Sequence, residues 1–162
     1  MSSISIGETA PAFELNGIDG KAYKLNEDGA RLTLAVFFKT TCPTCRMAWP
    51  YVEKLYQQYR AAGLAVWGIT PDARDVSAEF AANHGSTFPI LIDRERSVSR
   101  AYGPQFVPTL LLVDRDNTIQ ESVVAFDKAG LNRLAQAIAA RLNAPAVIVA
   151  AADDGNPAFK PG

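Results

Sequence analysis

The sequence has few of the residues that form covalent cross-links or metal sites. Its 162 residues include two cysteines and one histidine. A structural zinc site needs four ligands, commonly two cysteine pairs or cysteines with histidines. Two cysteines also cannot supply the several disulfides on which small secreted domains depend. A zinc-bound or disulfide-dense fold is therefore not expected, and 48% hydrophobic residues are enough for one domain with its own core.

Long apolar runs and blocks of like charge are also missing. No apolar stretch approaches the roughly 18 residues of a transmembrane helix. The charges are mixed and sum to −1, which leaves no basic stripe for nucleic acid. Segment 1–7 lacks the basic and apolar regions of a signal peptide. We expect a cytoplasmic protein as the sequence stands, and an exported or membrane-tethered one if the chain was cut from a longer precursor.

Both cysteines lie in one stretch, Cys42-Pro43-Thr44-Cys45, between an apolar run at 32–38 and an apparent helix. A Cys-x-x-Cys beside a β-α pattern is typical of a thiol/disulfide redox motif. The helix N-terminus would stabilise a thiolate, which is the species that attacks disulfides. A structural disulfide is the alternative, but closing so short a loop contributes only about 2 kcal/mol, and cytosolic thiols are kept reduced.

Hydrophobic periodicity predicts strands that alternate with helices, followed by a final hairpin and helix. This order implies a mixed central sheet covered on both faces. We predict one domain over residues 1–143 and a C-terminal tail over 144–162, with an edge strand at 147–149. The other predicted elements are a hairpin at 13–25, strands at 32–38, 64–69, 88–92, 109–113 and 119–126, and helices at 43–62, 72–84, 97–102 and 131–142.

The ordered set of features resembles the thioredoxin fold over most of residues 5–143. Pro50 lies where thioredoxins kink the helix that follows their cysteines, and Val107-Pro108-Thr109 precedes a strand as the cis-proline loop of that family does. The resemblance implies a thioredoxin-like three-layer α/β/α sandwich with a mixed central sheet, an N-terminal hairpin and an αβ insertion. It also implies that Pro108 is cis and that this loop, through the backbone of Val107, binds substrate. An ordinary trans-proline loop is the alternative.

Within this superfamily the chain resembles the TlpA-like and redoxin (alkyl hydroperoxide reductase/thiol-specific antioxidant) branch. Segment 7–13 is similar to the opening of that branch, 16–21 to its early hairpin, and 70–93 to the αβ unit inserted before the cis-proline loop. The resemblance implies a thiol-disulfide oxidoreductase without a cofactor. Its partners would be disulfide-containing or thiol proteins, or a peroxide.

Four positions depart from the patterns of these families. Peroxiredoxins carry a proline and a threonine before their peroxidatic cysteine, where this chain has Ala35 and Lys39. Thioredoxins keep a buried aspartate where Val36 stands, and many TlpA-like proteins a glutamate where Ala48 stands. Ala35 and Lys39 disfavour a peroxidase. Val36 and Ala48 stand in place of the acids thought to help move the proton of the second thiol.

We expect Cys42 to be the catalytic nucleophile, because it precedes the helix and should be the more exposed sulfur. Cys45 should be more buried and act as the resolving thiol. Pro43 suits the first helical turn, although it denies the thiolate one N–H donor. Thr44 could offer its hydroxyl to tune the site, although a solvated side chain is the favoured expectation.

Lys39 and Arg46 flank the cysteines, where either cation could stabilise a thiolate or simply be solvated. Phe38 and Trp49 could form an apolar rim for a partner or pack in the core. Three functions are consistent with these features: exchange of electrons with disulfides of partner proteins, a peroxiredoxin-like thiol peroxidase with Cys42 peroxidatic, and a redox-switched binding module without turnover.

Overall fold

The computed structural model describes residues 3–27 and 29–162. Its elements in chain order are β1 (Glu14–Gly17), β2 (Ala22–Lys24), β3 (Leu32–Phe37), α1 (Pro43–Tyr59), the short 3₁₀ helix η1 (Arg60–Ala62), β4 (Leu64–Thr70), α2 (Arg74–Asn83), β5 (Ile90–Ile92), α3 (Ser97–Tyr102), β6 (Thr109–Asp114), β7 (Ile119–Val124), β8 (Phe126–Asp127), α4 (Lys128–Leu142) and β9 (Phe159–Lys160).

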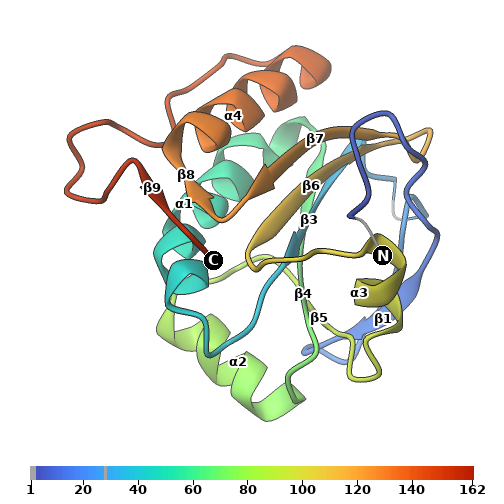
Figure 1. Cartoon of the computed structure of the whole chain (residues 1–162). Helices are drawn as coiled ribbons and strands as arrows, with labels where there is room; N and C mark the ends of the chain where they lie inside the picture. Colours follow the sequence, from blue (N-terminus) through green and yellow to red (C-terminus); the bar gives the residue numbers. More distant parts are fainter. Residues whose placement is uncertain (1–2, 28) are drawn as a thin grey trace.

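A mixed sheet of seven strands, in the order β2-β1-β5-β4-β3-β6-β7, forms the centre of the described part of the chain (Figure 1). β3 pairs parallel with β4 and antiparallel with β6. All six residues of β3 are buried, since helices or loops cover both faces of the sheet at this point. Strands buried on both faces have continuous apolar sequences, which is why this strand could be predicted.

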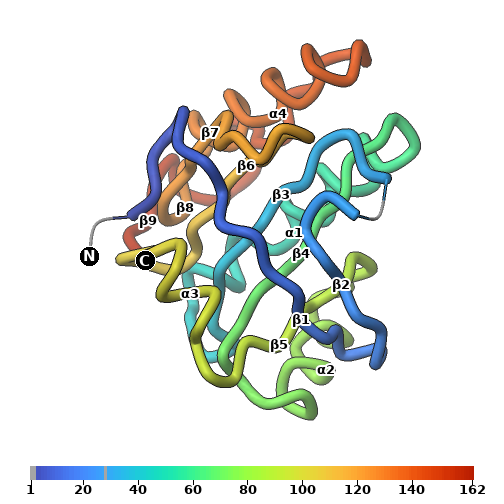
Figure 2. Tube along the Cα trace, turned by 90° about the vertical axis from the view of Figure 1, so that its right-hand side faces the viewer, coloured from blue at the N-terminus to red at the C-terminus, as the bar shows by residue number. Residues whose placement is uncertain are grey.

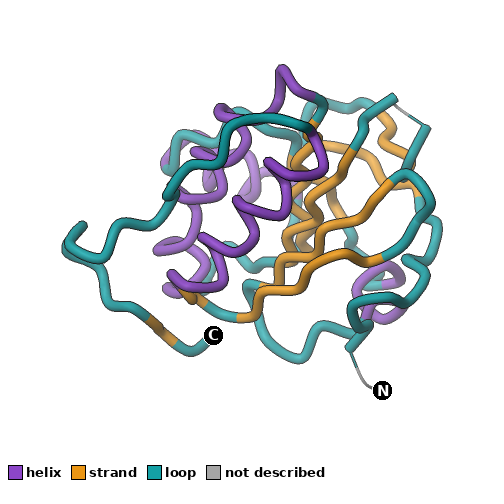
Figure 3. Tube along the Cα trace, turned by 90° about the horizontal axis from the view of Figure 1, so that it is seen from above, coloured by secondary structure: helices purple, strands orange, loops and turns teal. Residues whose placement is uncertain are grey.

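Three helices, α1, α2 and α4, lie on one face of the sheet, and α3 lies on the other (Figure 3). Figure 2 shows the N-terminal segment running over the second face beside α3, where the Tyr102 hydroxyl donates to the Pro11 carbonyl at 2.6 Å. Each side has its own apolar core, with Trp49 in the first and Trp67 in the second. The predicted thioredoxin-like three-layer sandwich with a mixed sheet is confirmed.

The N-terminal hairpin and the αβ insertion both extend the sheet. β1 and β2 pair antiparallel through a turn in which Gly20 has a φ of 82°, a conformation that glycine adopts without strain. β1 then pairs antiparallel with β5, the strand of the insertion, and β5 pairs parallel with β4. The insertion thus joins the hairpin to the centre of the sheet.

Several element boundaries differ from the sequence prediction, among them the starts of β5 at Ile90 and of α4 at Lys128, where the sequence predicts starts at 88 and 131. The helix predicted from residue 72 begins at Arg74, because the Asp72 carboxylate accepts hydrogen bonds from Thr40 instead of capping the helix. The strand predicted over 119–126 stops at Val124, because Ala125 has a left-handed φ of 69°. The chain changes direction there and continues into β8, which belongs to a separate pair of strands.

The tail contains a strand, but not at the predicted place. Residues 147–149 do not form a strand, and the edge strand predicted there is wrong. Val149 is buried in the core beside α1 and α4, and its carbonyl accepts from Lys54 rather than from a sheet. Packing against the helices has overridden the β-propensity of the apolar run. The strand of the tail is β9, which pairs antiparallel with β8.

The helices of the described residues are too short or too polar to cross a membrane. The longest one, α1, contains Pro50 and carries its buried residues on the side that faces the sheet. Cys42 caps its N-terminus and Cys45 lies in its first turn, so the core contacts that position α1 also position both cysteines.

Candidate active site

Cys42 lies directly before α1, in the position that caps the helix. Its backbone is extended, and Pro43 begins the first turn, where a fixed φ favours helix initiation and the missing N–H costs little. The Cys42 sulfur accepts the backbone N–H of Cys45 at 3.1 Å. The side chain of Cys42 is half-buried, whereas Cys45 is fully buried. The first sulfur is therefore the more accessible of the two, and the second is reached through the first.

The Cys42 sulfur also faces the loop before β6. Its thiol lies 3.6 Å from the carbonyl oxygen of Val107, and the Val107–Pro108 peptide bond is cis, as predicted. Thr109 is buried at the start of β6, and its hydroxyl donates to the Phe106 carbonyl at 2.7 Å. The structure therefore brings Val107 of the predicted substrate-binding loop next to the motif, while the Thr109 side chain is turned back into its own loop.

Cys45 is held as a neutral thiol. Burial raises the pKa of Cys45 well above its ordinary value, and the contact with Cys42 raises it further. Val36 and Ala48, which replace the acids of related families, are both buried in the apolar core beside it. No carboxyl group stands at either position to take the proton from Cys45.

Asp72 organises the loop before the cysteines, a role that is not evident from the sequence. Its carboxylate accepts the Thr40 backbone N–H at 2.7 Å and the Thr40 hydroxyl at 2.8 Å. Burial raises the pKa of Asp72, but the hydrogen bonds from Thr40 and Thr70 and the charge of Lys39 outweigh it, and the net pKa lies below its ordinary value. The parallel pairing of β3 with β4 brings together the loops that follow these two strands. A contact between Thr40 and Asp72 is therefore consistent with the sheet topology.

The four residues predicted to tune the site have different environments. Lys39 is half-exposed, and its charge acts on Asp72. Arg46 is exposed and donates to the Thr40 carbonyl at 3.1 Å, which supports the loop. Pro43 is exposed at the start of α1.

Thr44 is not solvated as predicted. Its side chain is 4% exposed, and its hydroxyl donates to the carbonyl of Pro161 in the tail at 2.6 Å. Phe38 and Trp49 do not form a rim for a partner, because both are buried and their rings lie 4.2 Å apart, centroid to centroid, in the core.

The arrangement of a half-buried cysteine before a helix, a buried cysteine in its first turn and a cis-proline loop matches known proteins. The profile of the AhpC/TSA family matches residues 6–122. The chain belongs to the AhpC/TSA family. The matched span includes the hairpin, both cysteines, the αβ insertion and the cis-proline loop, and it ends before α4 and the tail.

Individual relatives agree with this family. The chain is 30% identical over 123 residues to thiol-disulfide oxidoreductase ResA of Geobacillus thermodenitrificans, covering 75% of this chain and 71% of the relative. A Chlorobium tepidum structure described as a candidate thiol:disulfide interchange protein DsbE superposes with a TM-score of 0.78 at 28% identity, covering 86% of this chain and 99% of the other. A candidate protein disulfide isomerase of Bacteroides thetaiotaomicron superposes with a TM-score of 0.80 at 25% identity, covering 86% and 91%.

Proposed function

We propose that this protein is a thiol-disulfide oxidoreductase in which Cys42 attacks a disulfide of a partner protein and Cys45 resolves the mixed disulfide. The observation that carries the proposal is the geometry at the Cys42 sulfur, which accepts the Cys45 amide N–H and faces the carbonyl of Val107. The amide N–H stabilises a thiolate at the helix start. Relatives named thiol-disulfide oxidoreductases support the reaction class.

The reaction proceeds in two exchanges. The Cys42 thiolate attacks one sulfur of the partner disulfide, so that a Cys42–partner bond forms and the other partner sulfur leaves as a thiolate. Cys45 then gives its proton to water or to the thiolate released in the first exchange and attacks the Cys42 sulfur, which releases the second partner thiolate. The partner has gained two electrons, and the enzyme ends as the Cys42–Cys45 disulfide. Run in reverse, the same steps oxidise a dithiol partner.

The loop of Val107 and Pro108 supplies a backbone surface for the partner. The Val107 carbonyl lies beside the attacking sulfur, so an extended segment of a partner that pairs with this peptide brings its own sulfur close to Cys42. Such pairing uses main-chain groups and therefore accepts many partner sequences. A cytoplasmic location stays a prediction from the sequence, as does the absence of a nucleic-acid partner.

A peroxide is the less favoured oxidant. Ala35, which replaces the proline of peroxiredoxins, is buried within β3. Lys39, which replaces the threonine, is half-exposed, and its charge helps to lower the pKa of Asp72. Neither residue offers the hydroxyl that would polarise a peroxide beside Cys42.

A pair of assays tests the proposal. We expect the protein to accelerate the reduction of insulin by dithiothreitol and to consume hydrogen peroxide no faster than free cysteine does. Cys42→Ser serves as the control and should abolish the insulin reaction. Peroxide consumption that depends on Cys42, without insulin reduction, would identify a peroxidase. Turnover in neither assay, with a partner captured in only one redox state, would identify a binding module.

The resolving step should depend steeply on pH. Because burial raises the pKa of Cys45, its attacking thiolate is a small fraction at neutral pH and grows about tenfold with each pH unit up to that pKa. Single-turnover decay of a Cys42–partner mixed disulfide should therefore quicken by about this factor per unit between about pH 6 and about pH 8. A rate that is flat across this range would show that Cys45 is already ionised or has a base that takes its proton.

A further inference from the structure

The end of the tail returns to the active site. Residues 158–162, called here the returning segment, follow a long excursion outside α1 and α4 and come back beside the start of α1 (Figure 1). Within the segment, β9 pairs with β8 in the register Phe126↔Lys160 and Asp127↔Phe159. The backbone N–H of Lys128 also donates to the Ala158 carbonyl at 3.0 Å. Residues 159–160 of the segment therefore form a short strand at the edge of β8.

The returning segment contacts both halves of the site. The Pro161 carbonyl accepts from the Thr44 hydroxyl, inside the Cys-x-x-Cys motif, at 2.6 Å. Gly162 lies against the backbone of Val107, so closely that a Cβ added there would stand 2.2 Å from the Val107 oxygen. That oxygen is the one beside the Cys42 sulfur. The segment thus covers the backbone on which a partner strand is expected to pair.

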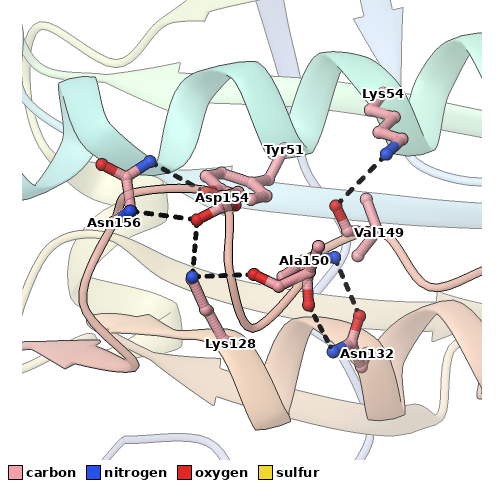
Figure 4. Close-up of polar contacts among 9 residues, drawn as sticks. Tyr51, Lys54, Lys128, Asn132, Val149, Ala150, Asp154 and Asn156 are labelled. Carbon is pink, nitrogen blue, oxygen red and sulfur yellow. Dashed lines mark hydrogen bonds and ion pairs between the residues drawn. The ribbon is translucent and has the colours of Figure 1, made fainter.

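The tail is held much more firmly before it reaches the site. Asp154 accepts from Lys128 at 2.5 Å and also binds the Tyr51 hydroxyl, which in turn accepts from Asn156 at 2.8 Å (Figure 4). The Lys128 side chain is almost fully buried, and its ammonium group donates to Asp154 and to the Ala151 carbonyl, the latter at 2.8 Å. A buried cation needs such acceptors, so this anchor resists opening.

A second anchor lies further upstream. The Asn132 side chain donates to the Ala150 carbonyl and accepts from the Ala150 N–H, both at 2.9 Å. Val149 and Ala150 are buried against the core. By contrast, Phe159 in the returning segment is 57% exposed. The strand β9 is only two residues long, and both pair with β8. The tail is therefore fixed at 149–156 and only lightly attached at 158–162.

We propose that the returning segment is an intramolecular competitor that occupies the docking surface for partner proteins and must be displaced before they bind. This inference rests on the proposed function and adds a regulatory device to it. The anchors keep the segment near the site at a high effective concentration, while its few contacts allow it to leave. A competitor of this kind lowers the apparent affinity for a partner by the fraction of molecules in which the site is open.

The inference predicts a difference between protein and small-molecule disulfides. A protein partner pairs with the Val107 backbone, so the returning segment must leave this backbone before the partner can bind. A small disulfide such as hydroxyethyl disulfide can reach the half-buried Cys42 without pairing with that backbone. Displacing the segment should therefore increase the rate of insulin reduction far more than the rate of reduction of the small disulfide.

Gly162→Val is the direct test, because its side chain cannot fit against Val107. We expect kcat/KM for insulin to rise by about threefold to tenfold, mainly through KM, with little change for hydroxyethyl disulfide. Ala152→Val is the matched control, an exposed residue of the same tail, and should leave both rates unchanged. Asp154→Ala loosens the anchor instead and should act in the same direction as Gly162→Val.

Amide NMR shows whether the returning segment has been displaced, independently of the insulin reaction rate. The Val107 and Thr44 amide signals should shift in Gly162→Val but not in Ala152→Val. Shifted signals with an unchanged or slower insulin reaction would overturn the inference, as would a wild-type segment found undocked. Absence of disulfide reduction in the wild type and in every variant would instead overturn the proposed function.

Discussion

Cys45→Ser should accumulate mixed disulfides between Cys42 and its partner proteins, while turnover with insulin falls by at least about 1,000-fold. The physical reason is the division of labour between the two sulfurs. Cys42 is half-buried before α1 and stays able to attack, whereas the fully buried Cys45 is placed to attack only the Cys42 sulfur. Without the Cys45 thiol, the mixed disulfide formed in the first exchange cannot be resolved. Non-reducing electrophoresis and mass spectrometry of the linked peptides measure the trapped species.

Cys42→Ser is the control for this experiment. It keeps Cys45, whose side chain has no exposed surface, and should trap nothing. If Cys42→Ser trapped partners and Cys45→Ser did not, the roles of the two cysteines would be reversed. Trapping by both variants would mean that Cys45 reaches solvent in a state that differs from this structure.

Trp49→Ala should lower the free energy of unfolding by about 3–5 kcal/mol, as measured by urea denaturation. The indole of Trp49 has no exposed surface and contacts Phe38 at 4.2 Å, Phe80 at 5.1 Å and Phe88 at 5.4 Å between ring centroids. These contacts join α1 and α2 with Phe38, which follows β3, and Phe88, which precedes β5, in the core that also contains Cys45. Removing the ring should therefore also reduce the rate of insulin reduction by each folded molecule.

Trp67→Ala separates the loss of stability from the loss of reaction rate per folded molecule. Trp67 is buried in the opposite core, where it contacts Phe13 and Tyr23 edge-on. Its loss should destabilise the fold to a similar extent but leave the rate per folded molecule unchanged. Trp49→Phe should cost less, because the buried indole N–H of Trp49 has no hydrogen-bond partner among the described residues. Equal loss of rate in both alanine variants would contradict a special link between Trp49 and the site.

Features with a strong local signal could be predicted from the sequence. The continuous apolar run of β3, the Pro43 that begins α1 and the turn at Gly20 each act through their own neighbours. Such signals suffice to place the cysteine motif at a strand-to-helix junction. The cis bond at Pro108 followed from the resemblance and not from local chemistry.

Contacts between distant segments could not be predicted in the same way. The bond between Asp72 and Thr40 depends on two loops that the sheet brings together. Lys128 lies in the first turn of an amphipathic helix, where a lysine is normally solvated, and only the fold of the tail gives it Asp154 as a partner. The apolar run at 147–149 has the local composition of a strand, but Val149 is buried in the core that α1 and α4 share, while Ile148 is 73% exposed.

The two tryptophans, one in each core, also give the molecule two separate optical probes. The chain has no other tryptophan, and the sheet stands between Trp49 and Trp67. Fluorescence from a Trp67→Phe protein therefore comes from the redox side alone, and fluorescence from a Trp49→Phe protein comes from the side of α3. The two halves of the sandwich can be followed independently without attaching any dye.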